Sequence, residues 1–210
     1  MSGNENKSVM PWAVDYEFRQ PVTKITETPP YEGLPTYERP RIRAGDPIRF
    51  SVNTIAEPTS LQGKRGYLIS PGPGWANFEL FCDEGTAMGG TDLAPSPLGY
   101  LTSAVAFCLL THITGFLHRE PMRISRIKVE MRGEFWTQRP GPDDGSQGAG
   151  GCDGFQCWVI IDSDEAPERI AGLIAVCRKA CMAMQTIATA VPTATRVLLN
   201  GEELSISSPG

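Results

Sequence analysis

The chain has 210 residues, of which 40% are hydrophobic and 20% charged, with 19 basic and 24 acidic side chains and a formal net charge of −5. This length predicts one compact domain with appendages and a core large enough to fold without disulfide bonds, which excludes a disulfide-rich miniprotein. Nucleic acid is not an expected partner, because the charge balance is mildly acidic and the sequence has no run of basic residues.

The first residues of the chain do not place a basic segment before an apolar one, so we expect a cytoplasmic rather than a secreted protein. In that reducing compartment, cysteines are more often buried fillers, metal ligands or redox-active thiols than structural disulfides. The six cysteines are Cys82, Cys108, Cys152, Cys157, Cys177 and Cys181.

Residues 1–46 are predicted to form a proline-rich extended arm without regular structure, and residues 47–210 the folded domain. Seven of the 18 prolines lie within the first 47 residues, where each fixes φ and removes a hydrogen-bond donor. Three strands of a meander are predicted after the arm, within residues 48–56, 67–70 and 77–83, because apolar and polar residues mix there between turn-like segments.

The segment Leu98–Leu117 is predicted to be a helix, because it contains no charged residue and Pro97 suits a first helical turn. Twenty uncharged residues also meet the length criterion for a membrane span. Several hydroxyl side chains, His112 and the lack of a basic N-terminal flank argue against a span. We therefore expect no membrane partner and expect this helix to be buried in a core or a subunit interface.

The rest of the chain alternates between strands and a second helix. Residues 123–136 alternate apolar and charged side chains as a strand does, the glycine-rich residues 141–154 predict a mobile hairpin loop, and residues 155–162 predict the partner strand. A helix is predicted through residues 166–189 and a last strand at residues 195–204. This order predicts an α+β fold with antiparallel sheets.

The residues that carry possible chemistry are two cysteines in apolar helical stripes, Cys108 and Cys181. Either thiol is interpreted equally well as a small buried hydrophobe, since a reactive cysteine needs a nearby cation or helix terminus to hold a thiolate. His112 follows Cys108 by four residues on the same helical face and is placed to stabilise a thiolate or to form one core hydrogen bond. With Cys177, these three residues would also make a Cys3His zinc site.

Other candidate motifs are less informative. Cys152 and Cys157 flank part of the glycine-rich segment and are interpreted as loop fillers, and Cys82 has no recognisable partner in the sequence. The chain contains neither a G-x-x-x-x-G-K-[ST] motif nor a G-x-G-x-x-G motif after a strand, so a nucleotide-binding loop is not predicted.

Two segments, APSPLGYLTSAVAFCLLTHI and IDSDEAPERIAGLIAVCRKACMAMQTI, resemble the OsmC/Ohr family of thiol-dependent hydroperoxide reductases over roughly residues 48–200. In that family a proline-led helix carries the first cysteine and a second helix carries the other. The resemblance places Cys108 at the peroxidatic position and Cys181 at the resolving position. It also implies an intertwined homodimer in which antiparallel sheets pack on long buried helices.

The resemblance implies a reaction cycle as well. The Cys108 thiolate attacks the O–O bond of an organic hydroperoxide and becomes a sulfenic acid, Cys181 condenses with it to a disulfide, and an external dithiol or lipoyl-type reductant restores both thiols. The cycle needs neither a bound cofactor nor a metal. Family members also use an arginine from an early turn, and Arg65 in Gly63–Gly66 is the best match, the alternative being that Arg65 is an exposed turn residue.

The sequence departs from the family pattern at two places. Peroxide-reducing members carry a glutamate just after the helix-opening proline, where this chain has Leu98, so Arg65 is expected to lack the carboxylate that orients it. Cys181 is followed by Met182 instead of the proline common in the family. The chain is therefore interpreted as a divergent member.

Three hypotheses of function follow. The first is thiol-dependent reduction of organic hydroperoxides with Cys108, Cys181 and Arg65 as catalytic residues. The second is a non-catalytic protein of the same fold that binds a small molecule or serves a structural role and has Leu98 in an apolar interface pocket. The third is a zinc-bound regulatory module.

Overall fold

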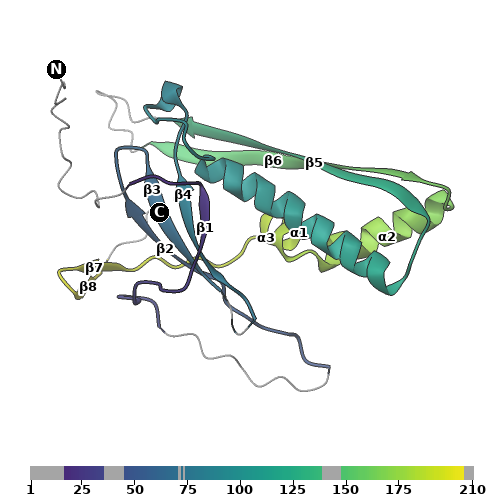
Figure 1. The fold of residues 1–210 in the computed structure, drawn as a ribbon, viewed down its shortest axis with the longest axis horizontal. Helices are drawn as coiled ribbons and strands as arrows, with labels where there is room; N and C mark the ends of the chain where they lie inside the picture. The colour runs from purple at the N-terminus through teal and green to yellow at the C-terminus, as the bar shows by residue number, and fades with distance from the viewer. Residues whose placement is uncertain (1–16, 36–44, 71, 73, 139–147, 206–210) are drawn as a thin grey trace. The chain divides into compact units, whose positions relative to one another are not determined.

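The computed structural model describes residues 17–35, 45–70, 72, 74–138 and 148–205. These residues divide into two compact units, one formed by the chain up to Pro97 together with the part from Arg196, and one formed by Leu98–Thr195. Figure 1 shows the helices and strands of both units. The α+β class with antiparallel sheets is confirmed.

The first unit contains a four-stranded antiparallel sheet in the order β1-β4-β3-β2. Its strands are β1 (Val22–Ile25), β2 (Asn53–Pro58), β3 (Lys64–Ile69) and β4 (Asn77–Cys82). The three-stranded meander was predicted. Strand β1 was not, because the surrounding prolines predict irregular structure, yet Val22 follows Pro21 directly and pairs with Leu80 at the edge of the sheet.

The same unit ends in a short hairpin where one strand was predicted. Strands β7 (Val197–Leu199) and β8 (Glu202–Leu204) pair through a turn at Asn200 and Gly201. Both turn residues have positive φ, 54° and 87°. An Asn-Gly pair is a strong hairpin signal, so the turn could have been predicted from the sequence.

The second unit places its helices along a long hairpin (Figure 1). The hairpin consists of β5 (Ile124–Gln138) and β6 (Ala149–Ser163), and the helices are α1 (Pro97–Arg119), α2 (Pro167–Ala180) and α3 (Met182–Ala188). Strand β6 begins earlier than predicted, because residues 149–154 pair with β5 instead of forming loop. The rest of the predicted loop, residues 141–147, lies outside the described residues.

Helix α1 forms as predicted, and it buries one stripe. Val105, Leu109 and Ile113 recur every four residues and are at most 1% exposed. The hydroxyls of Thr111 and Thr114 donate to the carbonyls of Phe107 and Leu110 within the helix, which satisfies these polar groups without another partner.

Part of the apolar surface of α1 is open in the single chain. Leu98 and Leu101 are exposed in the first turns of the helix, and Phe107, on the side opposite the buried stripe, is 68% exposed. By length and composition α1 is able to cross a membrane, and so are α2 and α3 if the bent pair counts as one span. Core helices of soluble proteins meet the same criterion, so this finding does not test the expectation of no membrane partner.

The predicted helix over residues 166–189 is broken at Cys181. Helices α2 and α3 meet there at 72°, and Cys181 has an extended backbone with φ −72° and ψ 109°. Its N–H still donates to the Cys177 carbonyl, and its carbonyl accepts from the Gln185 N–H, so the backbone of Cys181 takes part in both helices. No proline or glycine marks the break, which is why apolar periodicity alone predicts one continuous helix.

Candidate functional site

The core of the second unit gathers residues from α1, α2 and the break before α3. Leu109, Ile113, Leu173, Cys177 and Cys181 are all at most 2% exposed, and apolar residues of β5 and β6 pack against them. Cys108 lies at the border of this cluster and is half-buried. The two cysteines singled out in the sequence are thus brought to one place in the fold.

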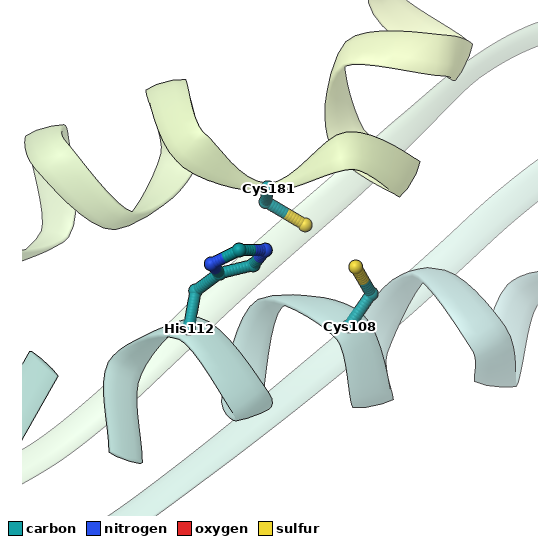
Figure 2. Close-up of side chains that lie close together, drawn as sticks. All are labelled: Cys108, His112 and Cys181. Carbon is teal, nitrogen blue, oxygen red and sulfur yellow. The ribbon is translucent and has the colours of Figure 1, made fainter. Parts of the chain in front are cut away.

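The sulfur atoms of Cys108 and Cys181 face each other, and the ring of His112 stands beside them (Figure 2). The two sulfurs and a ring nitrogen of His112 all lie within 4.8 Å of one another. Cys108 and His112 belong to successive turns of α1, so the helix fixes their common face. All six cysteines are free thiols.

Cys177 does not join this group. Its thiol is buried in the same core, and burial raises its pKa, although the positive charge of Arg119 lowers it in part. Among the described residues, the group of potential metal ligands here consists of Cys108, His112 and Cys181. The Cys3His set considered from the sequence is therefore reduced to a Cys2His set.

The Cys181 thiol is held in its protonated form. Burial raises its pKa, the backbone N–H groups of Met184 and Ala183 lower it, and the hydrogen bond and negative charge of Cys108 raise it again. The Cys181 side chain forms no capping hydrogen bond at the start of α3, although these two N–H groups act on its sulfur. At neutral pH Cys181 is therefore a thiol that stands next to the Cys108 sulfur.

Arg65 lies in strand β3 of the first unit, not in a turn. Its side chain is 20% exposed, so the interpretation of Arg65 as an exposed turn residue is wrong. One guanidinium nitrogen lies 2.8 Å from a carboxylate oxygen of Glu57, and the group also stands over the Tyr67 ring at 5.2 Å. Because Arg65 and Cys108 belong to different units, a role of Arg65 at the cysteine pair stays a prediction.

The expectation that Arg65 lacks an orienting carboxylate is also wrong. Glu57 is directly opposite Arg65 in the β2–β3 register. Burial by itself would lower the pKa of Arg65, but the hydrogen bond to Glu57 and the surrounding negative charge raise it, so the guanidinium is a fixed cation. Glu57 was not singled out from the sequence. The turn between β2 and β3 was the signal that could have predicted its pairing with Arg65.

The sequence model of the family described as OsmC-like protein matches residues 89–196, which contain α1, the β5–β6 hairpin and both later helices. The chain belongs to the OsmC-like family. The match confirms the resemblance drawn from the two helical segments.

Several solved structures are similar to this chain. An OsmC-like hydroperoxide resistance protein from Jannaschia sp. CCS1 is 22% identical with a TM-score of 0.47, and the match covers 68% of this chain and 87% of that one. An OsmC-like protein from Mycoplasma pneumoniae is 18% identical with a TM-score of 0.46, covering 67% and 87%. An organic hydroperoxide resistance protein from Legionella pneumophila is 12% identical with a TM-score of 0.41, covering 66% and 89%. No curated protein matches the chain.

Proposed function

We propose that this OsmC-like protein reduces organic hydroperoxides through a cycle in which Cys108 is the nucleophile and Cys181 the resolving thiol. The observation that carries the proposal is the convergence of the two free thiols of Cys108 and Cys181 in one place at the border of the core. Membership of the family supports it, and so does the description of similar proteins as hydroperoxide resistance proteins.

The first step is attack by the Cys108 thiolate on the terminal oxygen of the hydroperoxide. The O–O bond breaks, the alkoxide leaves and takes up a proton as an alcohol, and Cys108 becomes a sulfenic acid. Solvent water or the neighbouring His112, which stands within the same 4.8 Å group, supplies this proton.

The second step is condensation of the Cys181 sulfur with the sulfenic acid. Water leaves, and a disulfide forms between the two cysteines. Because the sulfurs already face each other, this step needs side-chain rotation more than backbone movement (Figure 2). An external dithiol or lipoyl-type reductant then restores both thiols by exchange.

The surroundings of the pair favour an organic over an inorganic peroxide. Leu101 of α1 lies two turns before Cys108 on the same helical face and is 43% exposed, so it offers apolar surface near the nucleophile. An alkyl or aryl group gains from such contacts, whereas hydrogen peroxide has no apolar surface to bury.

Arg65 is proposed to assist as a cation that orients the peroxide, with Glu57 orienting Arg65 in turn. The 2.8 Å ion pair supplies the carboxylate that Leu98 does not. This pair removes the main reason to prefer the non-catalytic hypothesis, which rested on the loss of that carboxylate. An open groove of about 550 Å³ lies between β6 and α2, but Leu98, Cys108 and Cys181 are not among its lining residues. It is therefore not the interface pocket that the non-catalytic hypothesis requires.

The direct test of the function is consumption of an organic hydroperoxide such as cumene hydroperoxide by the purified, reduced protein with a dithiol as electron donor. We expect multiple turnovers that need the dithiol, and slower turnover with hydrogen peroxide at equal concentration. Consumption that stops after one equivalent despite excess dithiol would contradict a catalytic cycle.

The resolving step should speed up as pH rises. Burial, the largest cause of the raised pKa of Cys181, remains after Cys108 is oxidised, so Cys181 is still mostly protonated at neutral pH. Since the thiolate is the attacking species, we expect the decay of the sulfenic acid to accelerate by about tenfold per pH unit below that pKa. Stopped-flow measurement of the decay at several pH values checks this, and a flat profile would contradict Cys181 as the resolving thiol.

A second copy of the chain is proposed to cover the exposed apolar side of α1, forming a homodimer. Phe107 is 68% exposed and stands one residue before Cys108, in the uncharged stretch 98–117 of α1. Burial of such a surface against an identical helix is the expected solution for a soluble protein. Light scattering should give twice the chain mass, and Phe107→Asp should shift the protein toward monomer, whereas a wild-type monomer at micromolar concentration would overturn this proposal.

A further inference from the structure

We propose that the reduced protein binds one Zn²⁺ per chain through Cys108, His112 and Cys181. This departs from the expectation that the site holds no metal. The three potential ligand atoms, two sulfurs and one imidazole nitrogen, lie within 4.8 Å of one another (Figure 2). In a tetrahedral zinc site the sulfurs lie about 3.8 Å apart, and sulfur and nitrogen about 3.6 Å, so small side-chain rotations complete the site.

The scaffold holds the ligands in place before the metal arrives. Cys108 and His112 stand one turn apart on α1, a long helix packed on the core, so their spacing is fixed by the backbone. Cys181 comes from the break between α2 and α3, where the 72° bend directs its sulfur to α1. Ligands on regular elements lose little freedom on binding.

The donor set selects a soft or borderline divalent ion. Two thiolates and an imidazole suit Zn²⁺, whereas Mg²⁺ and Ca²⁺ require oxygen ligands, and the group contains none. Two thiolates also cancel the charge of the ion, which allows it to sit at the edge of an apolar core. Binding converts two thiols to thiolates and releases two protons.

The site has three protein ligands among the described residues and leaves a fourth position for water or another thiol. Catalytic zinc sites have this arrangement of three protein ligands and one open position.

Zinc binding and the peroxide cycle compete for the same two thiolates. This competition rests on the proposed function, whereas the metal site itself does not. Bound zinc withdraws electron density from both sulfurs and so slows their attack on the peroxide. Conversely, oxidation turns both thiolates into a disulfide: one hydroperoxide, two protons and the zinc complex give alcohol, water, free Zn²⁺ and the disulfide. A disulfide does not hold the ion, so oxidation releases zinc.

The test is calorimetric titration of the full chain, reduced and stripped of metal, with Zn²⁺, and with Mg²⁺ as a control ion. Co²⁺ then serves as a probe, because tetrahedral thiolate ligation gives intense visible bands and a thiolate charge-transfer band. We expect one Zn²⁺ per chain, no heat with Mg²⁺ beyond dilution, and both cobalt signatures. Absence of zinc binding, or a cobalt spectrum without thiolate ligation, would overturn the inference.

Variants locate the ion. His112→Asn should weaken zinc binding by at least about tenfold, and Cys108→Ser should remove about half of the thiolate charge-transfer band, because one of the two thiolate ligands is lost. His118→Asn and Cys152→Ser are matched controls, because they change the other histidine and an exposed cysteine, and both should bind as the wild type does. Equal binding by His112→Asn and wild type would contradict the site. Circular dichroism of each variant separates loss of ligand from loss of fold.

The same samples distinguish failure of the inference from failure of the proposed function. With both correct, one equivalent of Zn²⁺ slows disulfide formation by cumene hydroperoxide, and a chelator restores it. Zinc binding without any peroxide-driven disulfide would leave the metal site intact and refute the cycle. Rapid disulfide formation without zinc binding would support the cycle and refute the metal site.

Discussion

Cys108→Ser protein is expected to consume organic hydroperoxide at least about a thousandfold more slowly than wild type, because a serine hydroxyl is not ionised at neutral pH and does not attack the O–O bond. The residue is half-buried at the border of the core, and sulfur and oxygen differ little in size. The variant should therefore fold, with a melting temperature close to that of the wild type. Initial rates of peroxide loss with excess dithiol measure the effect.

Cys152→Ser is the matched control for this experiment. Cys152 is an exposed thiol on β6 and is absent from the group at Cys108. Its replacement should leave the rate unchanged. Full activity in Cys108→Ser, or an equal loss in both variants, would show that the nucleophile is assigned to the wrong residue.

Cys181→Ser protein is expected to stop at the sulfenic acid of Cys108. The first step needs only the Cys108 thiolate, so one equivalent of peroxide should still be consumed, but the neighbouring sulfur that forms the disulfide is gone. A dimedone-type reagent should then label Cys108 in most chains, whereas wild type should give little adduct. Mass spectrometry of the tryptic peptides reads both outcomes.

Two results would count against this assignment. The first is unchanged turnover in Cys181→Ser, and the second is a disulfide between Cys108 and another cysteine formed as fast as in wild type. Cys177 is the most relevant alternative partner for Cys108, because it is buried in the same core cluster as Cys181. Since Cys181 is fully buried, the melting temperature of the variant must be measured beside its chemistry.

The elements with strong patterns could be predicted from the sequence. The uncharged run at α1 and the alternation in β5 gave the right type of structure, because both patterns follow from which face of an element meets the core. Strand β1 and the extension of β6 into the glycine-rich segment could not, because pairing with a neighbouring strand outweighs the local preference of proline or glycine.

The candidate site was predicted in part. The spacing of Cys108 and His112 placed both on one helical face, but only the break at Cys181 brings the third side chain to them, and no local signal marks that break. The partner of Arg65 was missed for a similar reason. Glu57 lies eight residues away along the chain and becomes its neighbour only through the register of the β2–β3 hairpin.

The central claim is that Cys108 and Cys181 form a disulfide in response to an organic hydroperoxide, and stoichiometric titration followed by peptide mass mapping tests it most directly. We expect the reduced, metal-free protein to consume about one equivalent per chain and to yield a Cys108–Cys181 disulfide before Cys82, Cys152, Cys157 or Cys177 is oxidised. Slow oxidation spread over all six cysteines would contradict the account.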